Sequence, residues 1–186
     1  RHETITPDGF ALVACHEVGH HYAGAPKIGG SGWASNEGQA DYFAGLKCLR
    51  RIFANDDNIA IVKAMDIPET VKSTCIEQFD SAPEQAICMR SSMAGYSVAN
   101  LFRALRKQDT LPSVDTPDTQ IVNRTNDRHP ATQCRLDTYF AGAVCDMDLE
   151  EGLSDSDPNI GTCSRKFGQT VGVRPLCWFK PSTNLS

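Results

Sequence analysis

The chain has 186 residues, which is enough to bury one continuous core without the help of a partner. A net charge of −5 at pH 7, with no basic cluster longer than two residues, argues against a nucleic-acid surface or a polybasic membrane contact. No run approaches the roughly 20 apolar residues that a transmembrane helix needs, so we expect a soluble chain without a membrane span and with a small or peptide substrate.

The first predicted helix covers residues 7–23. Thr6 is a candidate N-cap and Pro7 suits the first helical position, while Gly24 and Pro26 mark the end of the helix. A glycine-rich loop follows over residues 24–35, where Trp33 either packs beneath the loop or lines a substrate cleft. Packing is the interpretation that we favour.

Apolar spacing predicts further helices over residues 36–54, 58–79 and 83–107. Pro130 marks the start of a last predicted helix, which runs toward residue 145. Residues 108–128 have no period and predict a loop. Beyond residue 146 only residues 169–173 and 176–179 are strand-like, and they could pair with each other. The prediction is a mainly α (α+β) fold, one domain over residues 1–186, with a small β element near the C-terminus.

Eight cysteines form an even set without a CxxC motif, which argues against a zinc ribbon or a thioredoxin-like redox site. Disulfides are the better prediction, and they indicate a periplasmic or secreted protein. A removed leader or pro-segment would then explain why the chain opens so close to its most distinctive motif. The alternative is a cytosolic protein with buried thiols.

That motif is HEVGH at residues 16–20, an HExxH pattern on the first predicted helix. His16 and His20 are one turn apart, so both imidazoles can reach one metal ion. Glu17 is rotated by about 100° from His16, which places its carboxylate beside an open metal position as a candidate general base. The alternative is an ordinary helix with two surface or core-edge histidines.

A catalytic zinc site usually has three protein ligands and one open position, so a third ligand must come from elsewhere in the chain. Glu37 is the best candidate, because Glu37 and Asp41 are one turn apart on the next predicted helix. We expect Glu37 to bind the metal and Asp41 to accept the N–H of a ligand imidazole, with His16 as the preferred ring. Without this context, such a pair is usually a solvated helix face.

The combination of HEVGH with EGQAD at residues 37–41 resembles the gluzincin metallopeptidases, in which a glutamate from a second helix completes a two-histidine zinc site. HPATQCR at residues 129–135 follows the HPxxxxR pattern that accompanies these motifs in the M48 peptidases, the group of the CAAX prenyl protease. The resemblance covers about residues 7–41 and 126–141. It implies a gluzincin-like helical core with one zinc ion. Missing transmembrane helices and abundant cysteines favour an exported, soluble member.

His129 and Arg135 are the candidates for stabilising an oxyanion, since hydrolysis of an amide builds negative charge on the carbonyl oxygen. The resemblance to the M48 motif supports a role near the site. The alternative is that His129 caps a helix begun by Pro130 and that Arg135 forms a structural salt bridge.

These residues predict a zinc-dependent metalloendopeptidase that hydrolyses peptide bonds with a zinc-bound water activated by Glu17. His16, His20 and Glu37 would hold the ion, and the oxyanion would be shared with His129 or Arg135. Two alternatives stay open: a disulfide-stabilised zinc-binding structural or interaction protein without proteolytic activity, and a zinc hydrolase that acts on a non-peptide bond.

Overall fold

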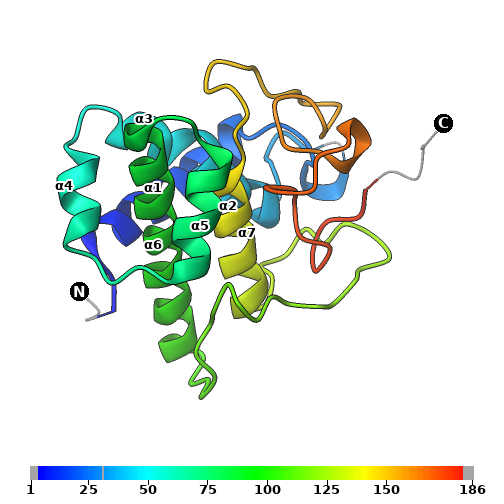
Figure 1. The fold of residues 1–186 in the computed structure, drawn as a ribbon. Helices are drawn as coiled ribbons and strands as arrows, with labels where there is room; N and C mark the ends of the chain where they lie inside the picture. The colour runs from blue at the N-terminus through cyan, green and yellow to red at the C-terminus, as the bar shows by residue number, and fades with distance from the viewer. Residues whose placement is uncertain (1–3, 31, 182–186) are drawn as a thin grey trace.

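The computed structural model describes residues 4–30 and 32–181 and is built mainly from helices (Figure 1). The prediction of a mainly α fold is confirmed. Three short helical turns accompany the α-helices: η1 (Ile28–Gly30), η2 (Ala44–Cys48) and η3 (Arg165–Phe167). The α-helices are α1 (Pro7–Tyr22), α2 (Glu37–Phe43), α3 (Leu49–Phe53), α4 (Asn58–Lys63), α5 (Glu69–Gln78), α6 (Ala82–Leu105) and α7 (Thr132–Val144).

Local capping explains where the long helices begin. The Thr6 hydroxyl accepts a hydrogen bond from the Gly9 N–H at 3.0 Å, and Pro7 occupies the first position of α1. Ser81 caps α6 in the same way, by accepting a hydrogen bond from the Glu84 N–H. Each cap satisfies a backbone N–H that has no partner within the helix.

Two predicted helices are interrupted. The segment predicted over residues 36–54 forms α2, a π-helical turn at η2 and then α3. The segment predicted over residues 58–79 divides into α4 and α5, with Pro68 as the residue before α5. Proline has no N–H to donate and restricts the residue before it, so a continuous helix across Pro68 is disfavoured.

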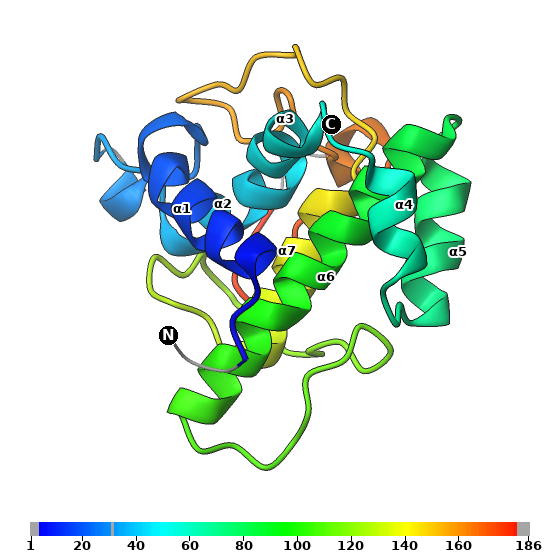
Figure 2. The same cartoon turned by 90° about the vertical axis from the view of Figure 1, so that its left-hand side faces the viewer.

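The longest helix, α6, passes through the middle of the molecule and contacts α1, α4, α5 and α7. Figure 2 shows α1 and α2 on one side of α6, and α4 and α5 on the other. Leu12 of α1 packs with Val98 of α6 and Tyr139 of α7 in one core cluster, and Val71 and Leu136 belong to a second. The core between α1, α6 and α7 therefore fixes the position of the first helix.

The chain after α7 is irregular and covers the side of the molecule formed by α2 and α7 (Figure 1). The predicted β element is wrong: neither residues 169–173 nor residues 176–179 form a strand, and the described residues contain only an isolated bridge between Lys27 and Ser35. Instead, the N–H groups of Val122 and Asn126 donate to carbonyls of residues 176 and 178. Gly172, inside the first of these two stretches, has a φ of 70°, which is not the extended backbone of a strand.

Two buried side chains of this irregular segment support α2. Trp178 is fully buried and lies so close to Gly38 that α2 has no room for a Cβ atom there. Arg174 is also buried and donates to the side-chain oxygen of Gln39 at 3.0 Å. Burial lowers the pKa of Arg174 to about 10.

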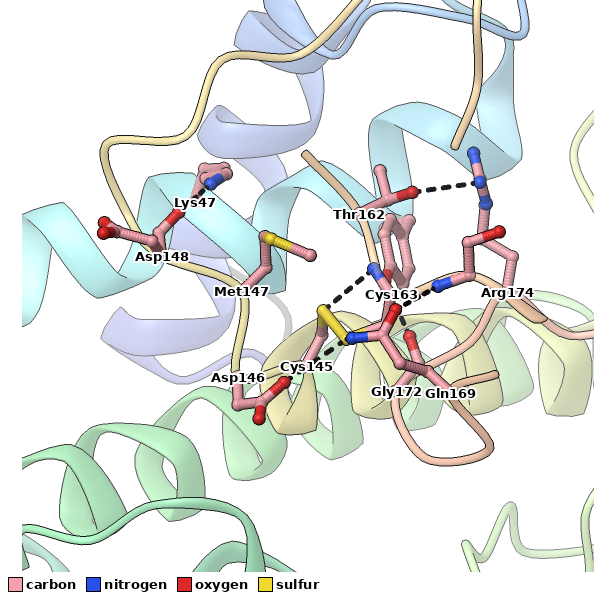
Figure 3. The surroundings of a disulfide bond; sticks show 12 residues. Lys47, Cys145, Asp146, Met147, Asp148, Thr162, Cys163, Gln169, Gly172 and Arg174 are labelled. Carbon is pink, nitrogen blue, oxygen red and sulfur yellow. Dashed lines mark hydrogen bonds between the residues drawn. A yellow bond between two sulfur atoms is a disulfide. The ribbon is translucent and has the colours of Figure 1, made fainter. Parts of the chain in front are cut away.

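All eight cysteines form disulfides, which confirms that prediction and fits a protein of an oxidising, extracellular environment. Figure 3 shows the bridge from Cys145, at the end of α7, to Cys163 in the irregular segment. The N–H of Cys163 also points to the Cys145 sulfur at 3.1 Å. The other pairs are Cys15–Cys48, Cys75–Cys88 and Cys134–Cys177.

None of the helices in the described part of the chain has the length and apolar character that crossing a membrane requires.

Candidate metal centre

Helix α1 presents His16 and His20 on one face, as their spacing predicts. The ring centroids are 4.8 Å apart and the ring planes are nearly perpendicular, at 83°. His16 is buried and His20 is partly buried. The two rings therefore lie one helical turn apart on the face of α1 that packs against α2.

Gly19, inside the HEVGH motif, sets the distance between these two helices. A Cβ atom at Gly19 would lie 2.9 Å from the Cα of Ala40 in α2, closer than packed atoms approach. The absence of a side chain thus allows the start of α2 to come against the histidine face of α1. Asn36 caps α2 by accepting a hydrogen bond from the Gln39 N–H at 2.9 Å, so Glu37 is the first helical residue.

Glu37 brings its Oε2 atom in front of both rings. Oε2 lies 3.2 Å from His16 Nε2 and 3.7 Å from His20 Nε2. One ligand atom from each of the three residues falls within 4.8 Å of the others, an arrangement that can hold a metal ion. Oε2 is buried yet lacks a hydrogen bond of acceptable geometry, although imidazole nitrogens surround it. A bound cation would satisfy this atom, so the residues fit a metal.

The other nitrogen of each ring is already occupied. His16 Nδ1 lies 2.6 Å from Asp41 Oδ1, which is the contact expected for this aspartate. His20 Nδ1 lies 2.8 Å from the main-chain oxygen of Ser35. Because a carbonyl or carboxylate oxygen only accepts, Nδ1 must carry the proton in each ring. Both Nε2 atoms, which face Glu37, are then free to bind a metal ion.

Arg135 completes the support behind His16. Its Nε donates to Asp41 Oδ2 at 2.8 Å and its Nη2 donates to Asp41 Oδ1 at 2.7 Å. Asp41 is fully buried, which alone would raise its pKa, but Arg135 and His16 outweigh burial and keep the pKa of this carboxyl low. The buried chain Arg135–Asp41–His16 thus holds one ligand ring in a fixed orientation.

The metal-free site favours a charged His16. Burial lowers the pKa of this ring, but the hydrogen bond with Asp41 and the nearby Glu37 carboxylate raise the pKa to about 9 in total. For Glu37 the effects have the opposite sign: burial alone would raise its pKa, but His16 and His129 outweigh burial, and the pKa is lowered. A cation would therefore take the place of a proton that the two carboxylates attract to the same position.

Glu17 is exposed and forms no ion pair among the described residues, which leaves its carboxylate available. It lines a cavity of about 190 Å³ between α1, α6 and α7, and His16 lines the same cavity. The remaining wall combines apolar and polar side chains: Val13, Val98, Phe102, His129, Arg135 and Tyr139.

His129 precedes α7 and lies at the mouth of the site, with 55 % of its side chain exposed. Its Nδ1 is 2.9 Å from Glu37 Oε2, and its ring is stacked toward that of His16 with centroids 6.2 Å apart. Arg135 differs: two of its guanidinium nitrogens are occupied by Asp41, and Nη1 lies 3.4 Å from His129 Nδ1. Of the two predicted oxyanion donors, His129 is therefore the one that has access to the site.

All seven residues singled out in the sequence are brought to one place: His16, Glu17, His20, Glu37, Asp41, His129 and Arg135. Sequence reasoning missed Ser35, which acts through its main-chain oxygen and so gives no side-chain signal. It also missed Gly19, although a glycine in the middle of a helix is itself a sign of close packing.

The prediction that Trp33 packs beneath its loop is wrong. The side chain is 72 % exposed, and its ring lies 4.9 Å from the ring of His21, which is itself exposed. The loop is tied instead through its backbone, because the buried Lys27 Nζ donates to the Trp33 carbonyl at 3.2 Å.

Two other groups of potential ligand atoms occur in the described residues, Asp118 with Cys134 and Cys177, and Asp146 with Cys145 and Cys163. In both groups the cysteines are joined as disulfides. Since the thiolate is the form that binds metal, neither group competes with the histidine site.

No protein-family model matches the chain, and no curated protein or solved structure was found that matches it. What the site can do must therefore follow from its own residues.

Proposed function

We propose that the protein is a zinc-dependent metalloendopeptidase of the M48-like gluzincin type, acting in the periplasm or outside the cell. The observation that carries this proposal is the convergence of His16 Nε2, His20 Nε2 and Glu37 Oε2 beside a free carboxylate, that of Glu17. Two imidazoles and one carboxylate form a ligand set that suits zinc and leaves a position open. The four disulfides support the exported location.

Zinc bound by these three residues would supply Lewis acidity, which activates a water molecule and polarises a scissile carbonyl. Glu17 then accepts the proton of the attacking water and passes it to the leaving amine. The His129 ring donates a hydrogen bond to the oxyanion that develops on the carbonyl. Asp41 and Arg135 are positioning residues, because they act only through the orientation of His16.

The cavity beside Glu17 supports a polypeptide substrate. Its volume of about 190 Å³ is enough for one side chain of medium size, and Val13, Val98 and Phe102 make part of its wall apolar. A substrate side chain placed there would bring the adjoining peptide bond to Glu17 and His129. Binding of neighbouring side chains thus orients the reacting bond.

The test is zinc-dependent cleavage of a mixed peptide library by the purified protein and by the Glu17→Gln variant. The variant should bind one zinc ion per chain as the wild type does, because Glu17 is not a ligand. Its turnover should fall by about 10²- to 10⁴-fold, the usual contribution of a general base. Zinc content is measured by elemental analysis, and cleavage by mass spectrometry.

Glu69→Gln is the matched control, since Glu69 is an exposed glutamate on α5, on the other side of α6. This variant should cleave peptides at the wild-type rate. Undiminished cleavage by Glu17→Gln, or cleavage that persists after a chelator has removed the metal, would refute the proposed mechanism.

A second candidate is a zinc-binding structural or interaction protein without activity. The distance of 2.9 Å between His129 Nδ1 and Glu37 Oε2 favours it, since His129 could serve as a fourth ligand and close the site. The His129→Ala variant separates the two candidates. Unchanged zinc affinity with slower cleavage supports the peptidase, whereas a large loss of zinc affinity supports the closed structural site.

A further inference from the structure

Beside the metal centre lie three exposed rings, those of His21, Tyr22 and Trp33, which we name the aromatic patch. Tyr22 and Trp33 are each 72 % exposed, and His21 is exposed as well. The His21 ring joins the patch together, with ring centroids 4.9 Å from Trp33 and 6.3 Å from Tyr22. Large aromatic side chains that gather in water at one place usually mark a binding surface.

The patch is continuous with the proposed active site. His21 follows the ligand His20 and lies one turn beyond Glu17, so Glu17 and His21 share a face of α1. The loop that carries Trp33 also reaches the metal ligands directly, because Ser35 accepts the hydrogen bond of His20 Nδ1. A chain bound across Glu17 therefore meets the aromatic patch on leaving the site.

The backbone beneath Trp33 is held in place. Lys27 Nζ donates to the Trp33 carbonyl at 3.2 Å and pairs with Asp155 at 2.7 Å. The Gly29 N–H donates to the Asp127 carboxylate at 2.9 Å. Because the loop is already anchored, a ligand that covers the Trp33 ring loses little binding free energy to ordering the main chain.

We infer that the aromatic patch binds an apolar or aromatic side chain of the polypeptide substrate, a few residues from the bond that is cut. This inference rests on the proposed function, because the occupant is the chain that Glu17 would help to cleave. Such a side chain would cover the rings of Trp33 and His21 and remove apolar surface from water. The protein should thus prefer stretches of polypeptide that carry exposed Phe, Tyr, Leu or Trp.

Tryptophan fluorescence gives a readout that does not depend on cleavage. The chain has two tryptophans, and Trp178 is fully buried, so acrylamide quenching reports mainly on Trp33. Zinc-loaded Glu17→Gln protein is titrated with two decapeptide mixtures, randomised except for a central Phe or Leu in one and a central Ser or Asn in the other. The apolar mixture should protect Trp33 from acrylamide at concentrations where the polar mixture does not.

Kinetics with the apolar mixture complete the test. Trp33→Ala should raise KM by about tenfold and leave kcat within about twofold, since the lost contact is remote from the reacting bond. Trp33→Phe should restore most of the affinity. The control is Ile76→Ala, because Ile76 is 55 % exposed on α5, which lies on the opposite side of α6 (Figure 2).

The outcomes separate this inference from the proposed function. Two results together would overturn this inference and leave the peptidase proposal standing: zinc-dependent cleavage with an unchanged KM in Trp33→Ala, and Trp33 fluorescence that peptides do not protect from acrylamide. Protection of Trp33 by peptides that the wild type never cleaves would support the patch and overturn the peptidase. Protection by phosphatidylcholine vesicles, and not by peptides, would overturn the inference in favour of a lipid surface.

Discussion

At the scale of single residues, the direction of each proposed ligand nitrogen is set by a hydrogen bond on the far side of its ring. For His16 this bond goes to Asp41, which in turn is held by two donors of Arg135. The three side chains are buried together, so none of them can exchange its partner for water. Removing the aspartate charge therefore affects both the ligand and the arginine.

We expect Asp41→Asn to weaken zinc binding by about 10- to 100-fold, the usual effect of losing a partner behind a ligand histidine. The free energy of unfolding should also fall by about 3–5 kcal/mol, because Arg135 would remain buried without a counter-charge. Zinc affinity is measured by competition with a fluorescent chelator, and stability by urea denaturation. Asp66→Asn, at an exposed position, is the control. Wild-type zinc affinity in Asp41→Asn would contradict the role given to Asp41.

The stability of the metal-free protein should depend on pH through His16. Its pKa in the folded protein is about 9, above the ordinary value of 6.5. The protonated ring therefore stabilises the fold fully below pH 6.5, and this contribution is lost as the pH rises through 9. The loss should be on the order of 3 kcal/mol, since each pKa unit corresponds to about 1.36 kcal/mol.

Urea denaturation of chelator-treated protein at a series of pH values measures this effect. The decline should be absent in His16→Gln and unchanged in His21→Gln, because His21 is exposed and is not bound by a carboxylate among the described residues. Equal pH dependence in the wild type and in His16→Gln would show that another group is responsible.

At the scale of secondary-structure elements, the contact between α1 and α2 decides whether the ligands meet. Gly19 and Ala40 lie at this contact, and a Cβ atom on Gly19 would come within 3.0 Å of the Ala40 main-chain oxygen. Main-chain atoms of α2 cannot move aside as a flexible side chain would. Any side chain at Gly19 must push the helices apart.

Gly19→Ala should therefore lower the free energy of unfolding by about 1–3 kcal/mol, as overpacking usually does. We also expect weaker zinc binding, because Glu37 would move away from His16 and His20. The control is Gly152→Ala, since a Cβ atom there would meet nothing within 4 Å. Both variants are compared by urea denaturation and zinc titration. Full zinc affinity in Gly19→Ala would mean that the helix separation does not control the site.

The elements that could be predicted from the sequence are those whose formation depends on neighbouring residues in the chain. Capping by Thr6 and the proline at position 7 set the start of α1, apolar periodicity located α6, and the proline at position 130 indicated the start of α7. The ligand residues could be proposed because their spacing along a helix determines which face they share. The exposure of Trp33 and the pairing of residues 122–126 with 176–178 depend on contacts between distant segments, which no local pattern encodes.

At the scale of the whole molecule, two disulfides join segments immediately beside the site. Cys15 precedes His16 and links α1 through Cys48 to η2, the helical turn that directly follows α2, which carries Glu37. Cys134 precedes Arg135 and links α7 to the irregular segment through Cys177. These bridges restrict the motions that would separate the ligands.

Replacing both Cys15 and Cys48 with alanine should lower the free energy of unfolding by about 2–4 kcal/mol and should also weaken zinc binding. The matched control is the double replacement of Cys75 and Cys88, which join α5 and α6 at a distance from the ligands. This control should lose stability but keep its zinc affinity. Urea denaturation and zinc titration of both variants measure the difference, and equal zinc affinities would contradict the expectation.

The support that Trp178 and Arg174 give to α2 has a consequence for synthesis. Both residues leave the ribosome more than 130 residues after Gly38 and Gln39, the α2 residues they contact. The helix that carries Glu37 therefore lacks these contacts while the intervening residues are being synthesised. A nascent chain that has not yet reached Arg174 and Trp178 should therefore hold α2, and with it Glu37, less firmly than the folded protein does.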